Sequence, residues 1–306
     1  MGRIGSSNEV QKLCAHRGYH NARNDNDPER CLENTLEAYI EAYKWVDVAE
    51  CDVQLLKDDT IILAHDSTLF RVAEISNIIE SPFDSPAIQA LELTPEFLDR
   101  MSCFEEKPLP GTFLELLSES FTMQELWRLS HLSDGDYCEL TDGRREQVQW
   151  LIAHAPLSEL TLEQVRRVSL KKQACAPTLE SLLELLKLAN NEAKHLVIEM
   201  KPGNHRIVKP ILLLLEKLDV WSDVSLMSFD GELMTDLHRT WNQEKWKDKV
   251  SATLNTYLLV CSHVYPETEN HAAGYLADEK SVPALCDRLE EVGTRGIYLE
   301  FNETTV

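Results

Sequence analysis

The stretch 48–56 constrains the fold of this chain most, because it is a buried strand that carries acids. It is apolar enough for a buried β-strand, yet Glu50 and Asp52 interrupt it two positions apart. Side chains alternate along a strand, so both carboxylates point to one side, and Cys51 and Val53 to the other. Inward charges are costly unless they are paired or bound to metal. We therefore expect this strand to line a site where cations gather.

The rest of the chain alternates between strand and helix patterns. Strands are expected at residues 10–14, 48–56, 60–64, 195–200, 224–228, 250–254 and 296–301. Helices are expected to begin at Asn34 (with Glu37 completing a capping box), Thr178, Asp230 and Ser281. About seven strands alternating with helices predict an α/β fold, a TIM-type (β/α) barrel with a parallel sheet.

The alternation is lost between residues 72 and 176. This stretch holds six prolines and several acidic clusters, and plausible helix starts follow Thr122 and Thr161. We interpret it as a long, mostly helical insertion between barrel elements. The predicted barrel then comprises residues 1–71 and 177–306, with 72–176 inserted.

Composition narrows the classes of partner and compartment. The net charge of −22 argues against nucleic acid or an anionic membrane as a partner, and an anionic substrate needs local positive charge here. No run of about 18 apolar residues suggests a membrane span. The N-terminus is polar, and the eight cysteines are scattered without a C-x-x-C pair, which predicts reduced thiols in a cytoplasmic protein.

The first predicted strand runs into Ala15-His16-Arg17-Gly18. Arg17 can grip phosphate through a planar fork of donors, and His16 is suited to moving protons near neutral pH. Gly18 allows a sharp turn or a close approach. Taken alone, such a His-Arg pair is more often structural, so its meaning depends on the residues that follow.

The ends of the predicted strands carry a set of charged and polar residues. They are His16, Arg17, Glu50, Asp52, His65, Glu199, Lys201 and Ser228. Strand ends at one mouth of a barrel hold its chemistry, so these side chains are expected to converge. Three converging carboxylates repel each other unless a hard divalent cation joins them, and Mg²⁺ or Ca²⁺ suits oxygen ligands better than zinc does. The alternative is Glu-Lys and Asp-Arg salt bridges across a barrel without a metal.

These residues together resemble a known family. His16-Arg17-Gly18, Glu33-Asn34-Thr35, Glu50-Cys51-Asp52-Val53 and the stretch from His65-Asp66 to Arg71 are similar to motifs of the glycerophosphodiester phosphodiesterase family. Pro177-Thr178-Leu179-Glu180, Glu199-Met200-Lys201 and Ser228-Phe229 follow in that family's order. The resemblance covers roughly residues 11–71 and 176–240, and it supports the barrel.

The resemblance implies a role for each matching residue. His16 and His65 are the implied acid/base pair, Arg17 and Lys201 the phosphate-binding cations, and Glu50, Asp52 and Glu199 the ligands of one divalent cation, Mg²⁺ or Ca²⁺. Around them, Glu33 orients Arg17 or serves helix-start electrostatics. Asn34 is expected to cap its helix, with contact to the substrate as the less favoured alternative. Asp66 and Arg71 pair behind His65, and Ser228 either lines the mouth or ends its strand.

The implied activity is metal-dependent hydrolysis of glycerophosphodiesters to glycerol 3-phosphate and an alcohol. Two alternatives stay open at this stage, a lysophospholipid phosphodiesterase of phospholipase D-like chemistry and a barrel that binds phosphodiesters without turnover. The partner is accordingly a small glycerophosphodiester or lysolipid. The sequence leaves the alcohol, the choice between Mg²⁺ and Ca²⁺ and the oligomeric state open.

The C-terminal part departs from the family pattern. Members usually end with a Trp-Thr-Val-Asn strand and a Thr-Asp-x-Pro strand, and neither occurs here. We therefore expect that these strands have diverged or that the chain is cut short, and that at most seven barrel strands are present.

Overall fold

The structure is a computed structural model. It describes residues 13–74 except 22–23 and 25–26, then 134–139, 145, 148–149, 152–153, 155–188, 194–243, 246, 254–261, 294 and 296–300. The strands are β1 (Cys14–Ala15), β2 (Val48–Leu55), β3 (Ile61–Leu63), β4 (His195–Met200), β5 (Val224–Ser228), β6 (Thr256–Cys261) and β7 (Gly296–Glu300). The α-helices are α1 (Leu36–Ala42), α5 (Asp134–Cys138), α7 (Leu162–Val165), α8 (Leu179–Leu188), α9 (Val208–Leu218) and α10 (Gly231–Gln243). Three 3₁₀ turns, η3 (Leu157–Glu159), η4 (Lys171–Gln173) and η5 (His205–Ile207), complete the described elements.

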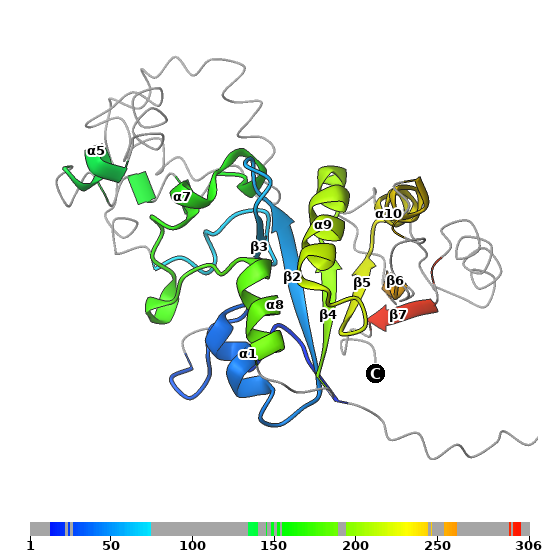
Figure 1. Cartoon of the computed structure of the whole chain (residues 1–306). Helices are drawn as coiled ribbons and strands as arrows, with labels where there is room; N and C mark the ends of the chain where they lie inside the picture. The colour runs from blue at the N-terminus through cyan, green and yellow to red at the C-terminus, as the bar shows by residue number, and fades with distance from the viewer. Residues whose placement is uncertain are drawn as a thin grey trace, which may run out of the picture.

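The described strands form one sheet in the order β1-β2-β4-β5-β6-β7 (Figure 1). Every neighbouring pair along this path is parallel. The predicted α/β class with a parallel sheet is therefore confirmed. The register of β2 and β4 places Asp52 opposite Glu199, which brings the acidic ends of two strands together.

Strand β3 departs from the expected parallel pattern, because it runs antiparallel to β2 outside the main path. The connection between them is a tight turn in which Leu56 N–H donates to Thr60 O over 2.8 Å and Asp59 has a φ of 62°. A parallel neighbour needs a crossover of a dozen residues or more, which this turn cannot supply. Residues 60–64 thus form a hairpin with β2.

The strand expected at 250–254 was placed too early in the chain. The structure has β6 at Thr256–Cys261, where Thr256 and Leu258 are both buried. Strands at 195–200 and 224–228 are confirmed with their bounds, and β7 is confirmed to within one residue. The predicted helix starts after Thr122 and at Ser281 lie outside the described residues, and the upper limit of seven strands stays a prediction.

The two faces of the parallel strands have different environments. Ala49, Cys51 and Val53 of β2 belong to the main apolar core, which α8, α9 and α10 supply with leucines and isoleucines. Figure 1 shows α8 and α9 beside β2 and β4. The opposite faces carry a small apolar cluster of four residues, Val48, Val197, Met227 and Leu259. By alternation, Glu50 and Asp52 lie on that same face beyond Val48, toward the carboxyl end of β2.

The first helix begins one residue later than expected. Thr35 is its N-cap, with Oγ1 accepting from Ala38 N–H over 3.3 Å, so the expected capping box of Asn34 and Glu37 is wrong. Asn34 instead has a left-handed backbone, with a φ of 54°, and its side chain turns away from the helix toward Asp52. The expected caps Thr178 and Asp230 are confirmed, since each accepts from backbone N–H groups of the turn that follows.

A second apolar cluster covers the β2–β3 hairpin. Leu56 and Ile62 pack there with Ile152, Leu157, Leu160 and Leu170 from the segment expected to be an insertion. Four backbone hydrogen bonds join this segment to the hairpin and the stretch after it, from Lys57 to Leu160, Leu157 to Ser67, Lys171 to Val72 and Glu74 to Ser169. The bounds of the predicted barrel and insertion stay a prediction. In the part of the chain that the structure describes, no helix is both long and apolar enough to cross a bilayer.

Gly18 fixes how the chain turns from β1 to α1, which gives a stability prediction. Its φ is +82°, and a Cβ built there would lie 2.7 Å from the Ala38 Cβ and 2.9 Å from the Ala38 carbonyl carbon. Gly203 has a similar φ of +89° with nothing within 4 Å. Gly203→Ala should lower the free energy of unfolding by about 1–2 kcal/mol from backbone strain alone. Gly18→Ala should lose a further ~1–3 kcal/mol from overlap with α1.

Urea unfolding of the two variants and the wild type measures this difference, read from the midpoint at unchanged slope. Equal losses in both glycine variants would show that α1 yields to the added methyl group.

Candidate active site

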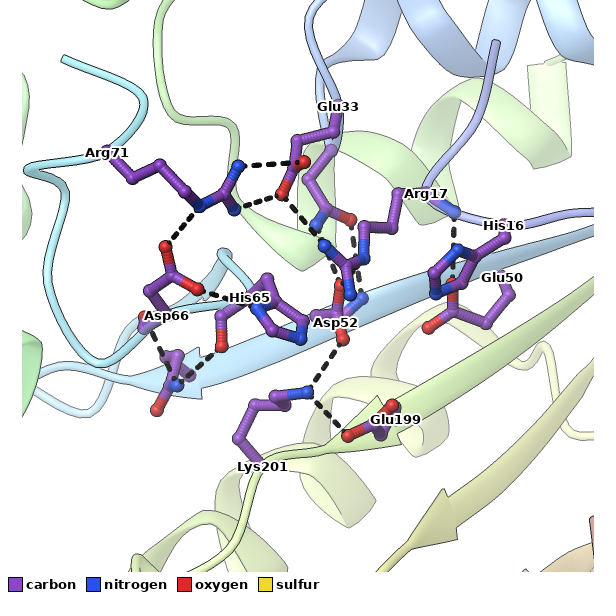
Figure 2. A network of polar contacts seen from close by, with 12 residues as sticks. His16, Arg17, Glu33, Glu50, Asp52, His65, Asp66, Arg71, Glu199 and Lys201 are labelled. Carbon is purple, nitrogen blue, oxygen red and sulfur yellow. Dashed lines mark hydrogen bonds and ion pairs between the residues drawn. The ribbon is translucent and has the colours of Figure 1, made fainter. Parts of the chain in front are cut away.

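Three carboxylates converge at the carboxyl ends of β2 and β4. Glu50, Asp52 and Glu199 each offer an oxygen atom, and these atoms lie within 4.8 Å of one another (Figure 2). All three side chains are buried. The parallel register explains the meeting, because Asp52 and Glu199 are direct neighbours across the two strands. The predicted convergence of the acidic residues is observed.

Two cations compensate part of this charge. Lys201 Nζ lies 3.0 Å from Asp52 Oδ1 and 2.6 Å from Glu199 Oε1. Arg17 Nε lies 3.1 Å from Asp52 Oδ2. The Glu-Lys and Asp-Arg salt bridges considered from the sequence are therefore both present. They satisfy Asp52 from two sides, and Glu199 from one.

Glu50 is not accounted for by these ion pairs. Its Oε2 accepts from the Arg17 backbone N–H over 3.0 Å, while Oε1 is buried with no hydrogen-bond partner among the described residues. A buried carboxylate oxygen without a partner is costly, because it has lost its water and gained nothing in exchange. Its partner is therefore not one of the described side chains.

The pKa shifts of the three acids follow from these contacts. Burial raises the pKa of Glu50 well above its ordinary value, and the charges of Asp52 and Glu199 add to the effect. Burial also acts to raise the pKa of Asp52, but Lys201 and Arg17 outweigh it and hold that pKa low. Glu199 has a raised pKa from burial, which Lys201 only partly offsets. Without a further cation, the site therefore contains more negative charge than it can compensate.

A divalent metal fits this set of groups. The donors are carboxylate oxygens from three side chains, which suit hard cations such as Mg²⁺ and Ca²⁺. The unpartnered Glu50 Oε1 and the raised pKa of Glu50 and Glu199 are what such a cation would relieve. The buried acidic triad can thus bind a divalent metal.

His16 lies at the turn after β1, beside the acidic triad. Its Nε2 is 3.8 Å from Glu50 Oε2, and its side chain is 57% exposed, so solvent or a ligand can reach it. Partial burial and the Arg17 guanidinium lower the pKa of His16 to about 4, although Asp52 acts in the opposite direction. The imidazole is therefore neutral near pH 7 and able to accept a proton.

His65 follows β3 on the hairpin and is held by its neighbour. Its Nδ1 lies 2.6 Å from Asp66 Oδ1. Burial acts to raise the pKa of Asp66, but hydrogen bonds from His65 and Arg71 prevail and lower it to about 2. An ionised carboxylate only accepts, so Nδ1 of His65 carries the proton. Gln54 of β2 steadies the turn by donating to the carbonyl groups of His65 and Asp66.

The predicted site residues come together in one network (Figure 2). It contains His16, Arg17, Glu50, Asp52, His65, Glu199 and Lys201. Ser228 does not join it, because its hydroxyl is buried and bridges Met200 O, over 2.7 Å, and the Asp230 N–H. Of the two roles considered, ending its strand is the one observed.

Sequence reasoning missed how Asp52 is held from behind. Asn34 Nδ2 donates to Asp52 Oδ2 over 2.9 Å, and the buried Tyr39 hydroxyl donates to Asn34 Oδ1 over 2.7 Å. A signal existed, since a tyrosine on the buried face of α1 needs a partner for its hydroxyl. The role of Asn34 as a helix cap competed with that signal, and the left-handed backbone at Asn34 was not visible in the sequence.

Comparison with known proteins settles the family. Residues 16–247 match the Glycerophosphoryl diester phosphodiesterase family. The chain belongs to this family. It is therefore an enzyme of the phosphoric diester hydrolase class. Among curated proteins, no sequence matches this one significantly.

Solved structures of glycerophosphodiester phosphodiesterases are similar to this chain, and one with a TM-score above 0.5 supports the fold. A provisionally named glycerophosphodiester phosphodiesterase from Galdieria sulphuraria is similar with a TM-score of 0.51 and 15% identity, over 95% of this chain and 75% of that chain. A glycerophosphodiester phosphodiesterase from Parabacteroides distasonis has a TM-score of 0.46 and 13% identity, over 94% of this chain and 83% of the other. With the family match, the predicted TIM-type barrel is confirmed.

The burial of Glu50 predicts an unusual pH dependence of stability in EDTA. Its pKa is raised in the folded state, so folding favours the protonated form, and stability is lost as pH rises from about 4.5 through the folded pKa. At pH 8, Glu50→Gln should be more stable than the wild type by roughly 1–3 kcal/mol, the cost of a buried unsatisfied group. The gain should vanish toward pH 4.5, where Glu50 is protonated.

Denaturation of both proteins in EDTA across this pH range measures the effect. The exposed Glu184→Gln serves as the control, since it removes the same charge from the surface of α8. A gain of the same size in Glu184→Gln would trace the effect to net charge and contradict this account of Glu50.

Proposed function

We propose that this enzyme hydrolyses glycerophosphodiesters to glycerol 3-phosphate and an alcohol, with one divalent cation, Mg²⁺ or Ca²⁺, held by Glu50, Asp52 and Glu199. One observation carries the proposal, namely that the buried acidic triad lies in a single network with two histidines and two cations. Phosphodiester cleavage needs charge stabilisation and two proton transfers, and these groups can supply both.

Arg17 and Lys201 are the proposed phosphate-binding residues. The chain carries a net charge of −22, so an anionic substrate is repelled at a distance and must be held by local positive charge. Arg17 is fixed by Glu33 and Asp52, and Lys201 by Asp52 and Glu199, so neither cation needs to be ordered when substrate binds. Such preorganised charge favours the transition state more than flexible surface charge would.

The substrate supplies the nucleophile in this mechanism. The glycerol 2-hydroxyl stands next to the phosphorus, and its attack forms an O–P bond while the P–O bond to the alcohol breaks. A divalent cation held by Glu50, Asp52 and Glu199 would lower the pKa of such a hydroxyl and would neutralise phosphate charge. His16 takes the hydroxyl proton, and His65, which starts this step as the imidazolium, donates its Nε2 proton to the departing alcohol. In the second step His65 removes a proton from water, which opens the cyclic phosphate, and His16 returns its proton to the 2-oxygen.

The environments of the two histidines support this division of roles. The low pKa of His16, about 4, keeps it neutral and ready to accept a proton at pH 7. The Asp66 carboxylate fixes the tautomer of His65 and stabilises the imidazolium when it forms. Both rings interact electrostatically with Asp52, which supports their action at one centre.

A cytoplasmic location is proposed together with the activity. It is supported by the free thiols of Cys14, Cys31, Cys51, Cys138 and Cys175. Thiols persist where the compartment is reducing.

Turnover with and without chelator tests the function directly. We expect release of glycerol 3-phosphate from glycerophosphocholine or glycerophosphoethanolamine, abolition by EDTA and recovery with Mg²⁺ or Ca²⁺, because the triad lacks its cation in chelator. Lysophosphatidylcholine is the third substrate in the same assay. Full turnover in EDTA would contradict the dependence on a metal. Faster hydrolysis of the lysolipid would favour a lysophospholipid phosphodiesterase. Binding of all three substrates without turnover would favour a barrel that binds phosphodiesters without cleaving them.

The histidines give a second kinetic prediction. His16→Ala and His65→Ala should each lower kcat by about 10²–10⁴-fold, the usual contribution of one general acid or base. His195→Ala is the matched control, because His195 begins the same strand that ends near Glu199 and pairs with Ser225 at the opposite end of the barrel. Its kcat should stay within a few-fold of the wild type. Losses of similar size in all three variants would point to a folding defect.

A further inference from the structure

We propose that Arg71 is a positioning residue that couples the phosphate-binding Arg17 to the acid His65 by holding Glu33 and Asp66 in one plane. The expected effect on the reaction rate rests on the proposed function. The coupling itself rests on hydrogen bonds that join five side chains in the order Arg17, Glu33, Arg71, Asp66 and His65 (Figure 2).

The Arg71 guanidinium engages two carboxylates at once. Nη1 donates to Glu33 Oε2 over 3.1 Å and Nη2 to Glu33 Oε1 over 2.6 Å, so this pair is bidentate. Nε donates to Asp66 Oδ2 over 2.6 Å. Because the guanidinium is planar and its donors are fixed in direction, the two carboxylates are held at a set distance and angle.

Glu33 carries the coupling on the side of Arg17. Its side chain is buried, at 4% exposure, and Oε1 also accepts from Arg17 Nη1 over 3.3 Å. Burial acts to raise the pKa of Glu33, but the hydrogen bond from Arg71 and the two guanidinium charges lower it, so the group is an ionised acceptor. Glu33 therefore orients Arg17, which is one of the two roles predicted for it from the sequence. Arg71 in turn fixes the position of Glu33.

Asp66 carries the coupling on the side of His65. One of its oxygens accepts from Arg71 and the other contacts His65 Nδ1, so the carboxylate is used at both ends. The backbone between the two residues is anchored as well. Leu69 is buried, at 1% exposure, and its carbonyl accepts from the N–H groups of Val72 and Ala73. Arg71 therefore lies on an anchored turn, and its hydrogen bonds fix the positions of Glu33 and Asp66.

The coupling matters because the proposed reaction needs the phosphate and the acid in one geometry. Arg17 would hold the phosphate, and His65 would protonate the alcohol that leaves it. A misplacement of about 1 Å between such groups can lower the rate by about 10²-fold. Arg71 joins their supports, so neither is free to move without the other.

A small cavity lies against this chain of contacts and gives the proposal a chemical test. Its volume is about 20 Å³, and Glu33, His65, Asp66 and Arg71 are among its lining residues. The Arg71 side chain is 39% exposed, so it can also be reached from solvent. Truncation to alanine would join the cavity to the space of the missing guanidinium. Free guanidinium ion could enter that space and bind both carboxylates.

The first experiment needs no turnover. In protein labelled with ¹⁵N-histidine, the His65 Nδ1–H should give a downfield proton resonance, because its hydrogen bond to Asp66 is short. Arg71→Ala and Arg71→Lys should both shift or broaden this resonance, since lysine keeps the charge but loses the planar fork. Arg206→Ala should leave it unchanged, because Arg206 pairs with Asp59 on the surface. An unchanged His65 resonance in both Arg71 variants would overturn the proposal.

The second experiment measures coupling by kinetics. Arg71→Ala and Asp66→Asn should each lower kcat by about 10–100-fold, as the loss of an outer support typically does. The double variant should be hardly worse than either, because both remove the same support of His65. Low millimolar guanidinium should restore part of the activity of Arg71→Ala, whereas urea, of similar shape but neutral, should not. Additive losses without rescue would overturn the proposal. If the wild type hydrolyses no glycerophosphodiester, the proposed function fails while the histidine resonance still decides the coupling.

Discussion

Three carboxylates are buried on neighbouring strands, and the other charged groups of the site are arranged around them. The register of β2 and β4 makes Asp52 and Glu199 neighbours, and Glu50 stands two residues before Asp52 on the same face. Water is excluded from all three, so each negative charge must be met by protein or by a bound cation. The charge of Asp52 is compensated by Lys201 and Arg17, and Asn34 donates a hydrogen bond to it. Glu50, in contrast, has one buried oxygen that none of these groups contacts.

The inner face of the sheet explains why the charge gathers at one end. Val48, Val197, Met227 and Leu259 form an apolar cluster there, and the carboxylates begin one alternation further along the strands. An apolar end and a polar end on one face place the polar groups where the strands end and the connecting turns begin. The turns then contribute His16 and Arg17 after β1, and Lys201 directly follows β4. The alternation of side chains along the strands therefore determines both which face packs in the core and where the charged groups gather.

Much of this arrangement could be predicted from local patterns. The alternation along residues 48–56 predicted both the strand and the side on which Glu50 and Asp52 lie, because strand geometry has a period of two. The strand ending at Met200 was also predicted, and its bounds are those observed. What escaped prediction depends on contacts distant in the chain. Asn34 was assigned to a helix cap because its partner Asp52 is 18 residues away, and its left-handed backbone leaves no mark in the sequence.

Strand β3 shows how a missed turn has consequences for function. Because β3 pairs with β2 as a hairpin, outside the main path of parallel strands, His65 lies on a hairpin whose other side is covered by residues 152–153 and 155–170. Backbone hydrogen bonds reach from that segment to Lys57, Ser67 and Val72, on both sides of His65. The two histidines are therefore supported differently. His16 directly follows a strand of the sheet, whereas His65 lies where the β2–β3 hairpin packs against the intervening segment. A substitution among residues 155–170 can therefore displace His65, one half of the proposed proton-transfer pair, while the carboxylates on β2 and β4 keep their positions.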